Sequence, residues 1–201
     1  MAAPIWDRLV GQDIVVAELA RAVDDAAPTL LSDDPAVHQG MTHAWLITGP
    51  PGSGRSTAAT SFAAALLCPD KGCGTCQVCR TVPFNGHPDA EIVTTESLSY
   101  SKAEAKELVR RAAMAPVSAP WHVIVVEDAD RLTDEAVNVL LKSIEEPPAH
   151  TVWLLCAPSV EDVLPTIVSR TRHVPLRTPS ADEVAALLVD NYGIDDALAG
   201  F

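Results

Sequence analysis

The sequence predicts an α/β fold built on a doubly wound parallel sheet. Apolar runs with strand character alternate with segments of helical spacing, and a glycine-rich turn joins the first such run to a helix of small residues. Two of the runs, 121–126 and 151–156, are almost continuously apolar, which is typical of parallel strands buried on both faces. In sheets of this kind the ligand site lies at the carboxyl ends of the strands.

Composition and charge exclude several classes of protein. The 201 residues are 48% hydrophobic, which suits one medium-sized domain and a fragment of another. The formal net charge of −13 argues against unaided binding of DNA phosphates, because such binding needs clustered Lys and Arg. It favours a partner that supplies the basic surface. No apolar run reaches about 18 residues and no basic segment precedes one, so we expect no membrane span, no signal peptide and a cytoplasmic location.

In the first half of the chain, apolar spacing and turn residues mark the expected elements. They are a helix over 14–23, a loop rich in Asp, Pro and Ser over 24–39, a strand over 44–48, a glycine-rich turn over 49–54, a helix over 56–67, a cysteine-rich segment, and a strand over 90–94.

The second half contains two helices with recognisable caps. Ser101 is the N-cap of the first, with Glu104 as its capping-box partner, and this helix is expected to end near Met114. Thr133 caps the second, and the proline pair at 147–148 ends it.

Buried strands are expected over 121–126 and 151–156, with a further short strand within 167–176. After Thr178-Pro179 the pattern changes to a short amphipathic helix over 180–189. This change predicts the start of a second, helical domain.

Residues 49–56, GPPGSGRS, have the spacing of a phosphate-binding loop with one substitution. Glycines let backbone N–H groups wrap around phosphate oxygens, and the following helix adds its positive end. An arginine stands where a lysine usually reaches the β and γ phosphates, and its planar fork is not equivalent to an ammonium group. The alternative is a glycine-rich turn without a ligand. The residues expected to hold phosphates are Gly49, Gly52, Gly54, Arg55 and Ser56.

Glu127 and Asp128 follow the strand 121–126, where P-loop ATPases place an Asp that holds hydrated Mg²⁺ and then a Glu that polarises water. Here the order is inverted, so the expected base position holds a side chain one methylene shorter. Misplacing a catalytic group by about 1 Å can cost on the order of 10²-fold in rate. For catalysis we favour the interpretation that both are solvated carboxylates.

Four cysteines have the spacing C-x4-C-x2-C-x2-C, and we predict that they hold a zinc ion. An iron–sulfur cluster and free thiols are the alternatives. The proposed ligands are Cys68, Cys73, Cys76 and Cys79. Cys156, in an apolar run, is interpreted as a core residue, and His87 before Pro88-Asp89 as a turn-forming residue.

Ser169 and Arg170 follow the segment 164–168. An arginine there is either an ordinary surface charge or an arginine finger that stabilises transition-state charge in a neighbouring subunit. Spacing alone does not decide between these alternatives.

Taken together, these motifs resemble the bacterial clamp-loader family of AAA+ proteins, the ATPase-fold subunits of DNA polymerase III. The similarity covers nearly the whole chain. Besides the cysteine knuckle, the segments that carry it are Val10-Gly11-Gln12, which is similar to the adenine-side box, Asn138–Pro148 (NVLLKSIEEPP), and Ser169-Arg170-Thr171, which is similar to the family's SRC motif.

The resemblance implies an AAA+ nucleotide-binding-type domain over 1–178 with a zinc module at about 68–79, followed by the start of a helical lid domain over 179–201. By this resemblance we expect the given residues to lack the family's C-terminal collar domain. The resemblance also implies that Val10 lies beside the adenine and that Arg170, with Ser169, acts in trans.

Within the family, the sequence is more similar to the delta-prime subunit than to the motor subunit gamma/tau. Arg55, the inverted acidic pair, His87-Pro88-Asp89 and Ala157-Pro158 match a degraded nucleotide site. The resemblance implies a non-motor subunit that is neither polymerase nor active ATPase, with Zn²⁺ bound and ATP or ADP bound weakly or not at all. The implied partners are the gamma/tau and delta subunits, and the sliding clamp and primed DNA through the assembled complex.

Two alternatives stay open. One is an active AAA+ ATPase such as the motor subunit, in which Arg55 would replace lysine. The other is a zinc-dependent DNA-binding module, against which the charge of −13 argues.

Overall fold

The computed structural model describes residues 3–29 and 40–192, and its centre is a sheet of five parallel strands. The strand order is β2-β3-β4-β1-β5. The strands are β1 (Ala44–Thr48), β2 (Ala90–Val93), β3 (His122–Val126), β4 (Thr151–Ala157) and β5 (Arg172–Pro175). The predicted doubly wound parallel sheet is therefore confirmed.

Helices follow or precede each strand in the alternation that the sequence indicates. They are η1 (Pro4–Arg8), α1 (Asp13–Thr29), α2 (Arg55–Leu67), α3 (Gln77–Thr81), η3 (Val82–Phe84), α4 (Lys102–Ala112), η4 (Ala129–Arg131), α5 (Asp134–Glu145), α6 (Pro165–Val168) and α7 (Ala181–Tyr192).

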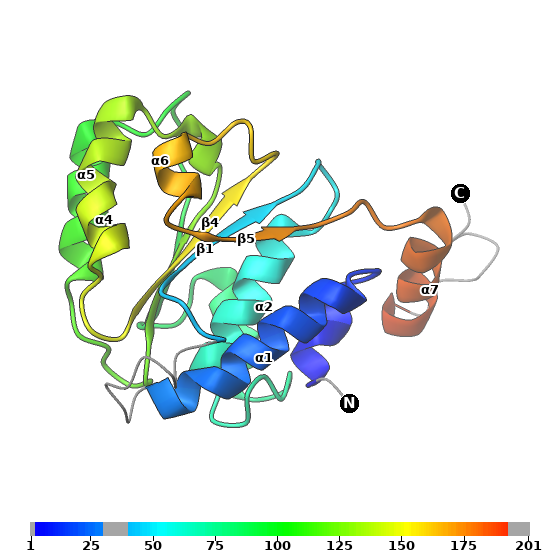
Figure 1. The fold of residues 1–201 in the computed structure, drawn as a ribbon. Helices are drawn as coiled ribbons and strands as arrows, with labels where there is room; N and C mark the ends of the chain where they lie inside the picture. Colours follow the sequence, from blue (N-terminus) through cyan, green and yellow to red (C-terminus); the bar gives the residue numbers. More distant parts are fainter. Residues whose placement is uncertain (1–2, 30–39, 193–201) are drawn as a thin grey trace.

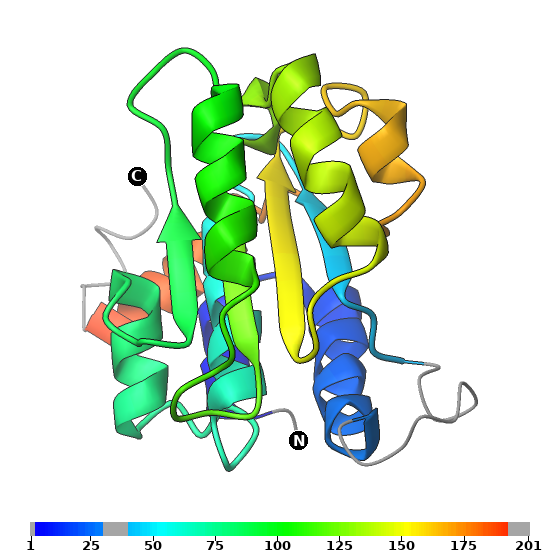
Figure 2. The same cartoon turned by 90° about the vertical axis from the view of Figure 1, so that its left-hand side faces the viewer.

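The molecule has three layers, with α1 and α2 on one face of the sheet and α4 and α5 on the other (Figure 1, Figure 2). Successive side chains of a strand point to opposite faces, and the core divides accordingly. Trp45 and Ile47 of β1 pack with α1 and α2, whereas Leu46 packs with α4 and α5. Both faces of the strand are buried, which explains its uninterrupted apolar sequence.

The predicted caps are present. The Ser101 hydroxyl accepts the N–H of Glu104 at 3.3 Å, and the Glu104 carboxylate accepts the N–H of Ser101 at 2.7 Å, which completes the capping box of α4. The Thr133 hydroxyl accepts the N–H of Ala136 at 3.2 Å and caps α5.

One boundary differs clearly from the prediction. Residues 24–29, expected in a loop, continue α1. Leu19, Ala22, Val23 and Ala26 are all buried at helical spacing, so the apolar stripe runs past the acidic pair at 24–25 that suggested a loop. The remainder of the predicted loop, 30–39, lies outside the described residues.

The short helices α3, η3, η4 and α6 were not expected from the sequence. Each spans five residues or fewer, too short to show an apolar period. Helix α7, in contrast, forms where a helix was predicted, and it stands beyond the end of β5, apart from the helices that cover the sheet (Figure 1). In the described part of the chain, no helix has the length and apolar character required to cross a membrane.

Candidate functional site

The carboxyl ends of three adjacent strands bring the predicted phosphate loop and the acidic pair together. β4 lies between β1 and β3, so the segments that follow β1, β3 and β4 share one edge of the sheet. The N–H of Gly49 donates to the carbonyl of Ala157 at 3.3 Å, and the Ser56 hydroxyl donates to a carboxylate oxygen of Glu127 at 2.8 Å. Gly49, Ser56 and Glu127, three of the residues predicted for this site, are therefore brought to the same edge of the sheet.

The loop needs its glycines for two different reasons. Gly52 and Gly54 have φ values of +82° and +86°, in the left-handed region that favours glycine. At Gly49 a Cβ would lie 2.5 Å from the Ser53 hydroxyl and 2.9 Å from the Leu176 carbonyl oxygen, so even alanine would collide. A Cβ at Gly52, by contrast, would meet no heavy atom of the described structure within 4 Å, which leaves the approach to this part of the loop open.

The guanidinium of Arg55 turns back onto its own loop. Its Nη1 donates to the carbonyl oxygen of Gly49, the first residue of the loop. A P-loop lysine acts on phosphates as a compact point charge. In this conformation Arg55 closes the loop on itself, and a nucleotide phosphate would have to compete with the Gly49 carbonyl for Nη1.

Glu127, not Asp128, faces the phosphate loop. Burial raises the pKa of Glu127 above its ordinary value, and the hydrogen bond from Ser56 acts in the opposite direction. Its backbone is held by Tyr100, which is fully buried and whose hydroxyl donates to the Glu127 carbonyl at 2.7 Å. Asp128 has a left-handed φ of +52° and lies 3.8 Å from Arg131, its ion-pair partner. The two acidic residues thus occupy different environments.

Gln12 connects the phosphate loop to the segment that leads to α7, a role that sequence reasoning missed. Its side-chain amide donates to the carbonyls of Arg177 at 2.6 Å and Ser53 at 3.4 Å, and its amide oxygen accepts the N–H of Arg177 at 3.3 Å. Gln12 is 4% exposed. Its place in the Val10-Gly11-Gln12 box could have indicated this role, but only Val10 of the box was predicted to be a site residue. Val10 itself is half-buried in the turn before α1.

A second contact ties the same box to α7. At Gly11, with φ +67°, a Cβ would lie 2.6 Å from a carboxylate oxygen of Glu183 in the first turn of α7. Arg177 pairs with Glu183 at 2.5 Å, and this contact holds the pKa of Glu183 at about 2. Direct contacts therefore link the N-terminal box to the phosphate loop and to the predicted start of the lid.

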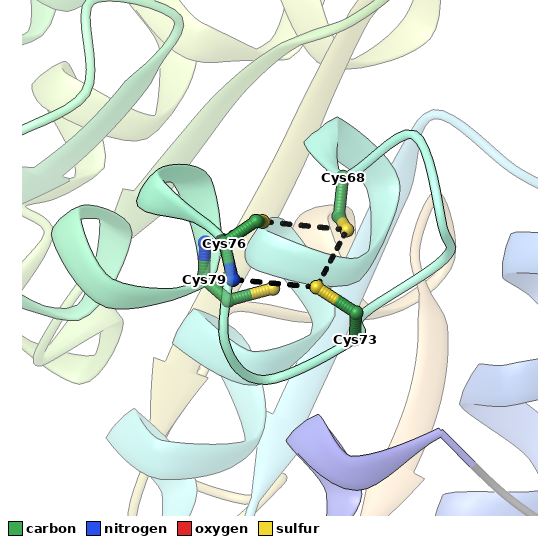
Figure 3. A group of neighbouring side chains, drawn as sticks. All are labelled: Cys68, Cys73, Cys76 and Cys79. Carbon is green, nitrogen blue, oxygen red and sulfur yellow. Dashed lines mark hydrogen bonds between the residues drawn. The ribbon is translucent and has the colours of Figure 1, made fainter.

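The four predicted ligand cysteines converge on one point (Figure 3). The Cys68 sulfur lies 3.8 Å from that of Cys73 and 3.6 Å from that of Cys76, and all four sulfurs lie within 4.8 Å of one another. Tetrahedral Zn–S bonds of about 2.3 Å require sulfur separations of about 3.8 Å, so the arrangement fits a zinc ion. In the described residues this is the group of side chains suited to a metal.

The polar surroundings of the sulfurs support thiolate formation on one side of the cluster. Backbone N–H groups of Thr75 and Cys76 lower the pKa of Cys73 to about 6. Burial raises the pKa of Cys79 above the ordinary thiol value. A bound cation would counter that cost of burial.

The cysteine knuckle is fastened to the N-terminal segment. The N–H of Ile5 in η1 donates to the Gly72 carbonyl at 3.0 Å. Gly72 has φ +100°, and a Cβ there would lie 2.4 Å from the Ile5 side chain. Lys71 pairs with Asp24 of α1 at 2.6 Å. The knuckle therefore helps to position the segment that leads into the Val10-Gly11-Gln12 box.

Asp89 has a structural role. It is 1% exposed, and its carboxylate accepts the N–H groups of Val117, Ser118 and Ala119 at 2.5, 2.8 and 2.9 Å. Its own N–H donates to the His87 ring at 3.1 Å, which confirms His87 as a turn residue. Cys156 is 1% exposed and is confirmed as a core residue.

Arg170 lies two residues beyond the end of α6. Its Nε pairs with Glu145 at the end of α5, and its Nη1 donates to the Thr166 carbonyl at 2.9 Å and the Ser169 hydroxyl at 3.1 Å. Its side chain is 35% exposed. Ser169 thus supports Arg170, and within the described residues neither side chain bonds to the phosphate loop.

The sheet order, the glycine-rich loop after β1 and the acidic pair after β3 define an AAA+-type P-loop fold. A DNA polymerase III gamma subunit-related protein from Thermotoga maritima is similar, with a TM-score of 0.58 at 18% identity over 89% of this chain and 57% of that one. A variant of Thermotoga maritima RuvB gives a TM-score of 0.65 at 16% identity over 100% of this chain and 58% of that one.

The chain belongs to the DNA polymerase III delta subunit family, whose model matches residues 31–180, and is thus a clamp-loader type of subunit. The DNA polymerase III subunit gamma/tau of Mycobacterium tuberculosis (strain H37Rv) is 32% identical over 94% of this chain and 32% of its own length. The delta' subunit of Pseudomonas aeruginosa is 34% identical over 69% and 44%, and that of Bacillus subtilis 30% identical over 68% and 43%. The chain therefore spans less than half the length of these relatives.

Proposed function

We propose that this protein is the non-motor, delta-prime-type subunit of a bacterial replicative clamp loader. In this role it joins gamma/tau and delta subunits in the cytoplasm and supports ATP-driven loading of the sliding clamp on primed DNA. Relatives of both the delta' and the gamma/tau kind match the chain at similar identity. The site residues, and not the overall identity, therefore favour the delta-prime role.

The observation that carries the proposal is the contrast between Arg55 and Arg170. Arg55 donates to the Gly49 carbonyl of its own loop, and Asp128, in the expected base position, pairs with Arg131. Arg170 is partly exposed and is held by side chains from α5 and α6. An arginine finger would add nothing to the chain's own site. It would contribute to catalysis in the ATP site of a neighbouring subunit.

Two ligands accompany this proposal. Zinc is held by Cys68, Cys73, Cys76 and Cys79, whose sulfur separations fit tetrahedral coordination. ATP or ADP binds weakly or not at all at Gly49–Ser56 with Glu127 and Val10, because Arg55 is engaged with Gly49.

One observation favours the second candidate, an active ATPase such as the motor subunit. In P-loop enzymes the loop Ser/Thr and a strand-end acid together hold Mg²⁺. Ser56 and Glu127 are 2.8 Å apart and could serve in that way. The placement of Asp128 beside Arg131 argues against a complete catalytic site.

The experiment that separates the candidates has two arms. Full-length protein is assayed alone for steady-state phosphate release, and mixed with gamma/tau and delta subunits to test whether it enters the loader. The proposal expects ring entry and no phosphate release above the background of an Arg55→Ala variant. Turnover by the wild-type protein that Arg55→Ala abolishes would support the motor alternative. Failure to enter the ring would refute both.

A further inference from the structure

Glu145 is the last residue of α5, and the proline pair after Glu146 prevents the helix from continuing. The carbonyl end of a helix carries partial negative charge, so carboxylates there are electrostatically unfavourable. Glu145 is paired at this position with Arg170, which lies 25 residues further along the chain. A residue placed against the preference of its helix and paired with a candidate functional side chain indicates a role for the pair.

The contacts of Arg170 are distributed unevenly over its guanidinium. Nε pairs with Glu145, and Nη1 is bound to the Thr166 carbonyl at 2.9 Å and the Ser169 hydroxyl at 3.1 Å. Nη2 has no hydrogen-bond partner within the described chain. A guanidinium is planar and presents its donors in a fixed fork. Nε–H and Nη1 lie on different edges of this plane, so contacts at both fix the orientation of the guanidinium and with it the direction in which the two N–H groups of Nη2 point.

We propose that Glu145 is a positioning residue for Arg170. By holding Nε, it orients the guanidinium so that Nη2 is presented to a phosphoryl group in the ATP site of an adjacent subunit. This inference rests on the proposed function, because it requires that Arg170 acts in trans.

Stability alone gives a weak reason for the contact. The side chains of Arg170 and Glu145 are 35% and 43% exposed, and exposed ion pairs contribute little to folding. Orientation, in contrast, has a large effect on reaction rates, since a displacement of about 1 Å can cost on the order of 10²-fold. The pair is thus expected to matter more for the reaction than for the fold.

The chain offers a matched control. Glu146 lies next to Glu145 at the same helix end, has the same charge and is exposed, and within the described structure it forms no hydrogen bond or ion pair with Arg170. Glu145→Gln and Glu146→Gln change the net charge equally. A difference between them therefore reports the contact with Arg170 and not the general electrostatic field.

The test uses full-length subunit in a reconstituted loader at matched ring occupancy, with clamp-dependent ATP turnover measured over a range of ATP concentrations. Glu145→Gln should lower kcat on the order of 10-fold, less than the roughly 10²-fold expected for a 1 Å displacement because Thr166 and Ser169 still hold Nη1. KM for ATP, zinc content and Tm should not change. Glu145→Asp should recover part of the rate, and Glu146→Gln should equal wild type.

Adding Glu145→Gln to Arg170→Ala should cause no further loss if the two residues act as one unit. If Arg170→Ala slows turnover while Glu145→Gln leaves it at the wild-type rate, the positioning role is refuted and the proposed function stands. If Arg170→Ala has no effect, the proposed function itself fails. Faster turnover by Glu145→Gln would mean that the contact restrains Arg170, which also contradicts the inference.

Discussion

The Ser56 hydroxyl donates to the Glu127 carboxylate at 2.8 Å across the edge of the sheet, joining the phosphate loop after β1 to the end of β3. These are the positions from which P-loop enzymes hold Mg²⁺. The geometry needed for a metal–nucleotide site is thus partly present, while Arg55 is bonded to the Gly49 carbonyl and Asp128 lies beside Arg131. The proposed absence of turnover is therefore compatible with a partly retained scaffold.

Replacing Arg55 by lysine should strengthen nucleotide binding without restoring hydrolysis. A lysine has no planar fork, and its compact charge suits phosphate oxygens, whereas Asp128 would stay beside Arg131. Titration with a fluorescent ADP analogue should show tighter binding by Arg55→Lys than by wild type, and weaker binding by Arg55→Ala. Hydrolysis by Arg55→Lys comparable to that of a gamma/tau subunit would show that the acidic pair is competent in its inverted order.

The cysteine knuckle should contain about one equivalent of zinc in protein purified without added metal, as measured by elemental analysis. Cys73→Ser should lose it, and Cys156→Ala, a buried cysteine outside the knuckle, should retain it. If zinc removal costs about 2–3 kcal/mol, Tm falls by roughly 5–10 °C for a chain of this size. Iron at one equivalent, or no metal, would contradict the assignment.

Removing the Gln12 amide should loosen the connection between the phosphate loop and α7. Gln12→Ala leaves the Arg177 N–H and carbonyl without their buried partner, which costs about 1–3 kcal/mol in unfolding free energy. Hydrogen exchange of α7 should rise more than that of β1. Ile14→Ala, at a nearby side chain that is 85% exposed, is the matched control. It should change neither the unfolding free energy nor the hydrogen exchange of α7. Uniform destabilisation without faster exchange in α7 would argue against a specific connection.

The buried carboxylate of Asp89 should cause the unfolding free energy to fall at acid pH. Burial alone would raise its pKa, but the N–H groups of Val117, Ser118 and Ala119 and the Ser118 hydroxyl outweigh burial and hold the pKa below its ordinary value. A carboxyl with a depressed folded-state pKa stabilises above its unfolded pKa of about 3.9, and this stabilisation is lost as pH falls through the folded value.

Asp89→Asn should therefore destabilise the protein at pH 7, on the order of 3 kcal/mol, because an amide cannot accept all of these bonds. The difference from wild type should shrink as the pH falls below about 4. Urea unfolding at several pH values measures this difference in unfolding free energy. An equal difference at pH 7 and at the lowest accessible pH would show that the carboxylate charge is not responsible.

Local sequence signals were sufficient for the sheet and the caps. β1 was predicted to the residue because its apolar run ends at the glycine-rich turn, and the Ser101–Glu104 pair has a spacing that only a helix start uses well. The end of α1 was missed because Asp24 and Asp25 read as loop, while the burial of Val23 and Ala26 in the tertiary structure kept the chain helical.

The candidate sites also combine features that the local sequence predicts with contacts that depend on the tertiary structure. The cysteine spacing predicted a cluster because ligands close in sequence fold back through tight turns at Gly72 and Gly74. The contacts of Gln12 with Arg177 span 165 residues, and that of Arg170 with Glu145 spans 25. No local pattern specifies partners at such separations, so these connections required the fold.

The proposed function requires that Arg170 serves a neighbour's ATP site, and one substitution tests this requirement. Full-length wild-type, Arg170→Ala and Arg170→Lys subunits are assembled with gamma/tau and delta at matched occupancy, and clamp loading on primed DNA is followed in time. Fingers of this kind contribute roughly 10³–10⁵ in rate at a single site, and a ring with several sites shows less in bulk. We expect Arg170→Ala to assemble normally and load slowly, with little rescue by lysine. Loading by Arg170→Ala at the wild-type rate would reduce Arg170 to a surface charge and contradict the account.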